Sequence, residues 1–173
     1  MHKAALAVIG FVLLSTILAQ RTNAQSTPIV NVQSGWQQAF SGQWLLVRFD
    51  GVEITDTHDM HEEGSPFINI VQSGYYRLEM ESVVGLGFPV IPPLGSSRDR
   101  TVLLQRIPEV GLPISIAQVS TAANSTSQSL AFERTEFLLL NGDTLRLLFR
   151  YTTAEEYLWF IVPSFRLQFI RVP

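Results

Sequence analysis

The sequence contains no cysteine. A disulfide framework, a thiolate zinc site and a cysteine nucleophile are therefore all excluded. Positive charge is also scarce, since the only lysine is Lys3 and the formal net charge is -3. A protein that binds nucleic acid by neutralising phosphate groups needs an excess of basic residues, so we expect no nucleic-acid partner.

Charged residues make up only 16% of the 173 residues, whereas hydrophobic residues make up 46%. A chain this apolar can bury a core and does not have the composition of a disordered protein. Its length fits one domain with a short appendage. Without disulfides, the fold must be held by its core or by association with other copies.

Residues 1–24 have the features of a secretory signal peptide. A short basic start that includes Lys3 precedes an almost unbroken apolar run over residues 4–19. Residues 22–24 then form a cleavage site, with Ala24 as the last residue removed. The run is shorter than the ~20 residues that a spanning helix prefers, although a retained anchor stays as the alternative. We expect a secreted or extracellular protein, periplasmic in a bacterium, with no transmembrane segment in the mature chain.

The mature sequence divides into two parts. Residues 25–40 lack strong periodicity and are predicted to form an N-terminal extension, and residues 41–173 are predicted to form the folded domain. No long stretch of the domain has the spacing of an amphipathic helix, and short β-rich runs recur instead. The predicted strands are 43–49, 66–71, 75–84, 101–107, 114–119, 127–132, 136–140, 144–151 and 158–172, the last broken at Pro163.

Alternation of apolar and polar residues is clearest just after Gly74. Tyr76, Leu78 and Met80 are separated by charged residues, so one face of this strand should be buried and the other exposed. The strongest turn signals are residues 72–74 and 141–143. Eight or nine strands at this spacing predict an all-β protein, an antiparallel β-sandwich with jelly-roll topology.

Three stretches resemble the C1q/tumour-necrosis-factor-like jelly-roll superfamily. Residues 68–76 are similar to its apolar strand and Gly-x-Tyr turn, and residues 138–145 to its leucine-rich strand followed by Gly-Asp. Residues 164–170 are similar to its closing Ser-Phe strand, although Arg166 and Leu167 stand where that strand usually has a glycine. The resemblance implies a sandwich of ten strands, usually trimeric, that acts as a binding module rather than an enzyme and needs no cofactor.

Local chemistry gives the residues of these motifs structural roles. Gly74 and Gly142 are expected at positions that cannot accommodate a side chain. Tyr76 should bury its ring and find a partner for its hydroxyl, and Asp143 should accept a hydrogen bond from the backbone of its turn. The set of residues predicted to carry the fold is completed by Leu138, Leu140 and Phe165.

Acidic residues and histidines cluster between the first two predicted strands. The cluster holds the only two histidines after residue 24, and its members are His58, Asp59, His61, Glu62 and Glu63. Such side chains can ligate Ca²⁺ or Zn²⁺, but neither the Ca²⁺-loop pattern nor His-Glu-x-x-His is present. A solvated loop is the simpler interpretation, so no metal site is assigned and cation binding stays open.

No catalytic residue is assigned either. A cupin-like metal enzyme needs about three histidines and a carboxylate in one barrel interior, whereas both histidines here lie on one short loop. The Gly-x-Ser-x-Gly elbow of serine hydrolases is missing. A glycosidase pair would have to come from carboxylates on or beside the predicted strands, which are more simply interpreted as an outward charged stripe. These carboxylates are Glu79, Glu81, Glu133 and Glu136.

Aromatic residues offer a further way to bind a ligand. Trp36, Trp44 and Trp159 could stack on sugar rings, which gives the alternative function of a monomeric carbohydrate-binding β-sandwich. Trp159 lies in the apolar run 157–162 and is expected in the core or in a trimer interface. The polar loop 121–129 contains an N-glycosylation sequon at Asn124.

The favoured function is that of a secreted homotrimer that recognises a protein or surface ligand through its loops. Aromatic residues form 10% of the chain, and a trimer interface would use the apolar surface that this composition leaves over. The sequence does not name the ligand, which is a protein or a glycan.

Overall fold

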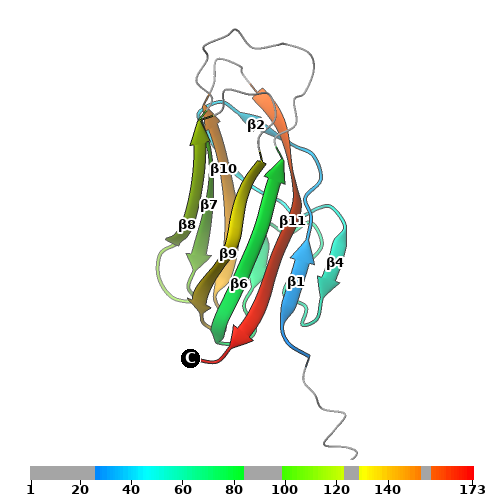
Figure 1. Cartoon of the computed structure of the whole chain (residues 1–173), viewed down its shortest axis with the longest axis vertical. Coiled ribbons are helices and arrows are strands. Elements are labelled where there is room, and N and C mark those ends of the chain that lie inside the picture. Colours follow the sequence, from blue (N-terminus) through cyan, green and yellow to red (C-terminus); the bar gives the residue numbers. More distant parts are fainter. Residues whose placement is uncertain (1–25, 84–98, 123–128, 153–156) are drawn as a thin grey trace, which may run out of the picture.

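Eleven β-strands and no helix make up the part of the chain that the computed structural model describes, residues 26–83, 99–122, 129–152 and 157–173 (Figure 1). The predicted signal segment, its cleavage site and Asn124 lie outside the described residues. The strands are β1 (Ile29–Val32), β2 (Gln37–Phe40), β3 (Trp44–Leu46), β4 (Glu53–Asp56), β5 (Phe67–Asn69), β6 (Gly74–Val83), β7 (Asp99–Ile107), β8 (Ile114–Ala122), β9 (Ser129–Leu139), β10 (Thr144–Thr152) and β11 (Tyr157–Arg171).

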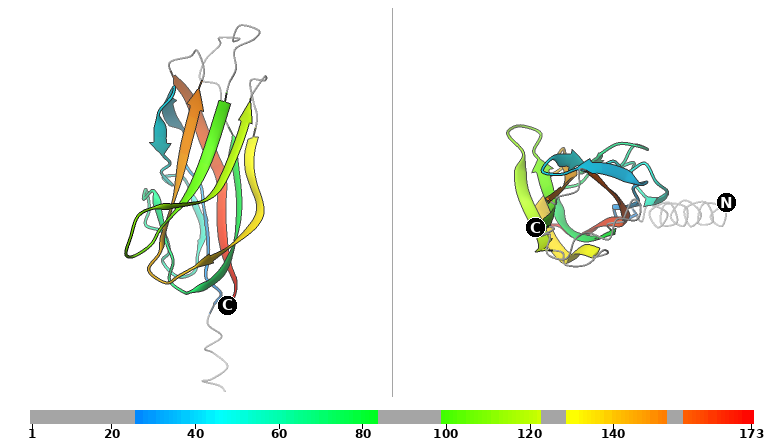
Figure 2. Two further views of the ribbon diagram at one scale, coloured as in Figure 1. Left: turned by 90° about the vertical axis from the view of Figure 1, so that its left-hand side faces the viewer. Right: turned by 90° about the horizontal axis from the view of Figure 1, so that it is seen from above.

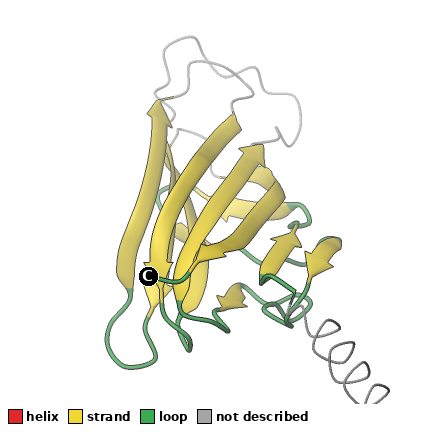
Figure 3. Cartoon of the chain, turned by 60° about the horizontal axis from the view of Figure 1, so that its bottom comes forward, coloured by secondary structure: helices red, strands yellow, loops and turns green. Residues whose placement is uncertain are grey.

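These strands form two sheets that enclose one interior (Figure 2). The first sheet is 6-stranded and has the order β4-β1-β11-β6-β9, with β2 paired to β11 beside that path. The second is 5-stranded and has the order β3-β10-β7-β8, with β5 paired to β10. Each pairing is antiparallel. The predicted antiparallel sandwich is confirmed, and Figure 3 shows its described part as strands joined by loops.

The sandwich starts earlier in the chain than the sequence predicts. Residues 25–40 are expected to be an extension outside the fold, yet they supply β1 and β2. In β1, Val30 is buried and lies opposite Leu167 of β11. Each of these two strands has only 4 residues, too few for alternation to stand out in the sequence. Pairing with β11, far along the chain, decides their conformation.

Pro163 does not break the last strand. β11 runs through it over 15 residues, and its pairing with β6 shifts register between Ile161 and Ser164. This bulge accommodates a residue that has no N–H to donate to the ladder. Ser34 supports the neighbouring backbone, because its N–H donates to Val162 O at 2.9 Å and its Oγ accepts from Val162 N at 2.7 Å.

Strand β9 corrects two further predictions. Residues 127–132 and 136–140 were expected as two strands, but Ser129–Leu139 forms one. Leu138 and Leu140 do not belong to the core, since they are 43% and 46% exposed, whereas Leu139 between them is fully buried. Three adjacent leucines show no alternation, so the sequence could not indicate which one faces inward.

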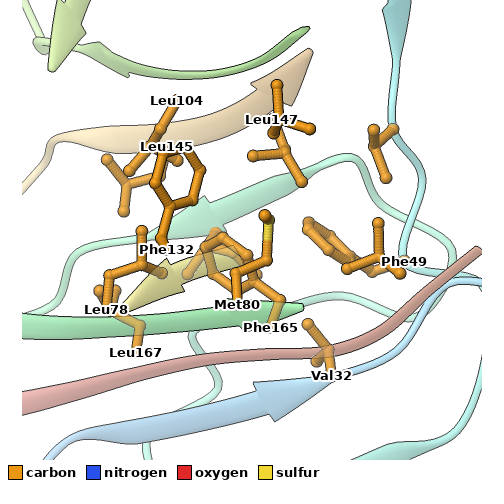
Figure 4. Packing of buried hydrophobic residues seen from close by; sticks show 14 of the residues in the cluster. Val32, Phe49, Leu78, Met80, Leu104, Phe132, Leu145, Leu147, Phe165 and Leu167 are labelled. Carbon is orange, nitrogen blue, oxygen red and sulfur yellow. The ribbon is translucent and has the colours of Figure 1, made fainter. Parts of the chain in front are cut away.

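The core lies between the facing sides of the two sheets (Figure 4). Phe165 of β11 is 1% exposed, and its ring centre lies 5.0 Å from that of Phe49. Phe149 of β10 stacks on Phe160 of β11 with 4.3 Å between ring centres. The inward-facing residues predicted from the alternation after Gly74 are all buried, namely Tyr76, Leu78 and Met80.

Both predicted glycine positions exclude other residues, for different reasons. A Cβ on Gly74 would lie 2.7 Å from Arg171 O and would collide with the ring of Phe169. Gly142 has a φ of 89°, a conformation that side chains on L-residues disfavour. Gly142 is therefore confirmed as a turn glycine, and Gly74, the first residue of β6, is confirmed as a position of close approach to β11.

Asp143 is buried at the turn between β9 and β10, with an exposed fraction of 2%. Its Oδ2 accepts a hydrogen bond from Leu140 N at 2.6 Å, as predicted for a turn aspartate. The same oxygen lies 2.7 Å from Arg106 Nε. This contact is an ion pair rather than a hydrogen bond, since the Arg106 Nε makes no hydrogen bond.

Tyr76 is fully buried, and its hydroxyl donates a hydrogen bond to Gln72 O at 2.8 Å, which confirms its predicted role. Burial raises the pKa of Tyr76 from 10.0 to about 12. Below pH 10 both the folded and the unfolded protein keep this proton. As the pH rises from 10 to about 12, the unfolded state ionises first, so the folded state loses stability over this interval.

We expect the Tyr76→Phe variant to lack this alkaline loss. At neutral pH the variant should be less stable by about 1 kcal/mol, because the bond to Gln72 O is gone. Between pH 10 and 12 the parent should lose about 3 kcal/mol more than the variant, at ~1.4 kcal/mol per pKa unit. Urea unfolding at a series of pH values measures both effects, and parallel pH profiles would contradict the expectation.

Candidate functional site

The acidic and histidine-rich loop joins β4 to β5, and its polar groups bond to one another. Asp56 Oδ1 accepts from His58 N at 3.1 Å, and Asp56 Oδ2 accepts from His61 N at 2.7 Å. Met60, in the middle of the loop, is fully buried. Among the described residues, no group of three or more histidine, aspartate or glutamate side chains is placed to hold a metal ion. Met60 and His61 fold onto the core, whereas Asp59, Glu62 and Glu63 are exposed, as expected of a solvated loop.

His61 shows how this happens. Its side chain is 2% exposed, with Nδ1 3.3 Å from Glu53 Oε2 and Nε2 3.2 Å from Ser65 O. Its ring meets that of Phe49 edge to face, with 6.0 Å between centres. Both polar neighbours are acceptors, so the ring satisfies both only when it carries two protons. The acidic residues and histidines made this loop a candidate cation site in the sequence. In the structure, His61 anchors the loop to the core.

Charged side chains of β6, β9 and β11 form ion pairs on the outward face of the first sheet. Arg77 Nη2 lies 2.9 Å from Glu136 Oε1, and Arg171 Nη1 lies 3.3 Å from Glu136 Oε2. The hydrogen bond from Arg77, helped by the nearby Arg171, lowers the pKa of the Glu136 carboxyl. Glu136 therefore belongs to a network of ion pairs on the sheet surface, as the charged-stripe interpretation predicts. The side chain of Glu133 lies outside the described part of the chain.

Aromatic side chains gather where β2 pairs with β11. Trp36, Phe40 and Trp159 are 56%, 45% and 38% exposed, and we call these three residues the aromatic patch. Strand alternation turns Phe40 and Trp159 outward, while the neighbours Leu158 and Phe160 are buried. The run 157–162 thus supplies the core with every second residue. Trp159 does not lie in the core of the subunit, and its other expected place, a trimer interface, stays a prediction.

Trp44 lies on the outward face of the other sheet and is 45% exposed. Its partner across the β3–β10 ladder is Arg150, and the guanidinium carbon lies 5.8 Å from the centre of the indole ring. Together with Thr101, Gln118 and Thr152 these residues line a pocket of about 330 Å³. The sequence draws attention to Trp44, but only strand pairing shows which polar residues surround it.

No protein-family model and no curated protein matches the sequence. Among the described residues, no helix is long and apolar enough to span a membrane. Solved structures, however, match the arrangement of the strands.

The globular domain of the zebrafish complement 1qA protein has a TM-score of 0.55 and 15% identity, and the match covers 86% of this chain and 100% of that chain. Eiger TNF from S. frugiperda has a TM-score of 0.53 and 12% identity, with 84% and 95% covered. Murine APRIL has a TM-score of 0.51 and 12% identity, with 79% and 99% covered. Identities this low show a shared fold alone. From the two sheets and these matches, the chain has the C1q/TNF-like jelly-roll fold.

Proposed function

We propose that the chain is the subunit of a secreted homotrimer that binds a protein or surface ligand. The proposal of a trimer is supported by the aromatic patch, whose three large side chains are at least 38% exposed. Burial of such a surface against other copies removes apolar area from water and favours association. The superfamily that the sequence resembles is usually trimeric, and three copies would add avidity to each weak contact. Secretion rests on the signal features of residues 1–24.

In this proposal the ligand binds to the loops. Between β7 and β8, Val110 and Leu112 are 89% and 83% exposed, which is the kind of surface that a protein partner buries. Binding is favoured over catalysis because the chemically reactive groups described above are engaged within the fold. His61 is held by Glu53 and Ser65, and Glu136 by two arginines.

The Trp159→Glu variant is expected to be a monomer where the parent is a trimer. A buried, unpaired carboxylate at the interface would cost several kcal/mol in each of the three contacts. Light scattering coupled to size exclusion measures the mass, which should fall from three subunits to one. Leu112→Glu is the matched control, because it places the same charge at another exposed apolar position and should leave the trimer intact.

A parent protein that remains a monomer across the measured concentration range would refute the trimer. So would a trimer that Trp159→Glu leaves unchanged, since the aromatic patch would then lie outside the interface. Circular dichroism of each variant separates loss of assembly from loss of folding.

A further inference from the structure

A row of four side chains crosses the outward face of the second sheet. Trp44 of β3 lies opposite Arg150 of β10, Arg150 lies opposite Thr101 of β7, and Thr101 lies opposite Ser120 of β8. Residues paired in this way project from the same face of a sheet at short separations. The four strands thus hold an aromatic ring, a guanidinium group and two hydroxyl groups in one line on a rigid support.

Three members of the row, Trp44, Arg150 and Thr101, line the pocket of about 330 Å³ together with Gln118 and Thr152. This volume is at the lower end of the range for small-molecule sites. Part of its polar wall is already ordered: Thr101 Oγ1 lies 3.0 Å from Ser120 Oγ, and Gln118 Nε2 donates to Ser120 Oγ at 3.2 Å. A ligand would therefore meet side chains held in place before it arrives, which lowers the entropic cost of binding.

Hydroxyl, amide and aromatic groups together suit a sugar. The electron-rich face of an indole attracts the weakly positive C–H groups on one side of a pyranose ring, and its area excludes water from that side. Gln118 and the threonine hydroxyls can exchange hydrogen bonds with sugar hydroxyls. The guanidinium carbon of Arg150 lies over the indole ring, 5.8 Å from its centre, at the outer limit of a cation–π contact. Trp44 is still 45% exposed, so part of the indole remains open to a ligand.

Charge narrows the choice of sugar. Among the described residues that line the pocket, Arg150 is the one with a formal charge, and none is acidic. A guanidinium group pairs with a carboxylate through two parallel hydrogen bonds, which makes it selective for planar anions. We propose that this pocket binds an acidic glycan, with a carboxylate-bearing pyranose stacked on Trp44 and its carboxylate paired with Arg150.

This site does not depend on the proposed trimer. The aromatic patch belongs to the β2–β11 end of the first sheet, whereas the pocket is built on β3, β7, β8 and β10 of the second. The two proposals can therefore fail separately. Trp159→Glu, which is expected to dissociate the trimer, should leave the affinity of each subunit for the sugar unchanged.

The test is an array of uronic-acid-containing oligosaccharides, each paired with its carboxyl-reduced counterpart, followed by calorimetric titration of the members that bind. The parent should bind at least one acidic oligosaccharide at least tenfold more tightly than its reduced form. Trp44→Ala should weaken that binding at least tenfold, and Trp44→Phe, which keeps an aromatic face, should recover part of it. Arg150→Gln should lower the affinity to that of the reduced form.

Trp36→Ala is the matched control, because Trp36 is even more exposed but lies outside the pocket, and it should bind as the parent does. Circular dichroism confirms that each variant is folded. Three results would overturn the proposal: binding of no acidic oligosaccharide, equal binding of acidic and reduced forms, or unchanged binding by Trp44→Ala. Loss of binding in Trp36→Ala alone would place the sugar on the aromatic patch instead.

Discussion

The Phe165→Ala variant is expected to lose about 3–5 kcal/mol in its free energy of unfolding. Phe165 is 1% exposed and packs against Phe49 with 5.0 Å between ring centres. Figure 4 shows it in the space between the two sheets, close to Met80 and above Val32. Truncation to alanine would leave a cavity that two hydrogen-bonded sheets cannot collapse to fill, so the cost should include lost packing as well as lost burial.

Guanidinium unfolding followed by tryptophan fluorescence measures this loss. Protein concentration must be the same for parent and variant, because association would stabilise both. Phe165→Leu keeps most of the buried volume and should cost less than about 1.5 kcal/mol. Val110→Ala, at a position 89% exposed, should stay within about 0.5 kcal/mol of the parent. A loss below about 1 kcal/mol in Phe165→Ala would contradict the packing described for the core.

The Asp143→Asn variant is expected to lose about 3 kcal/mol, because it leaves the charge of Arg106 without its partner in a mostly buried place. The carboxylate oxygen lies 2.7 Å from Arg106 Nε, and the two side chains are 3% and 22% exposed. Asparagine can still accept the bond from Leu140 N, so the turn itself should survive. The loss therefore reports the ion pair rather than the turn.

A double-mutant cycle with Arg106→Gln separates the pair from its surroundings. The loss of unfolding free energy in the double variant should be smaller than the sum of the two single losses by at least about 1 kcal/mol. The second substitution removes the arginine charge that the first leaves without a partner. Urea unfolding of the four proteins provides the comparison. Additive losses would mean that Asp143 and Arg106 act independently and that their short separation contributes little.

Local features of this fold could be read from the sequence. Alternation within a single strand predicts that Tyr76, Leu78 and Met80 face inward, and all three are buried as expected. Asp143 acts within its own turn, where chemistry over a few residues determines the conformation. Gly74 was indicated by its local motif, but the contacts that exclude a side chain there come from Phe169 and Arg171 of β11. The order of these motifs was enough to indicate the jelly-roll fold.

The features that could not be predicted from the sequence depend on pairing between strands that are far apart in the chain. β1 and β2 both pair with β11, and β1 also pairs with β4. The choice of Leu139 over Leu138 and Leu140 follows from the register with β6. The pocket at Trp44 likewise exists because β10 and β7 bring Arg150 and Thr101 beside β3.

Strand β11 occupies the centre of the first sheet, with β6 along one side and β1 and β2 along the other (Figure 1). On the ribosome, β1 and β2 emerge first of all the strands but have no partner in β11 until the eleventh strand is made. The nascent chain must therefore keep these segments from pairing with other molecules until β11 is available. Such long-range closure makes folding slow, and the first sheet cannot be completed before β11 is available.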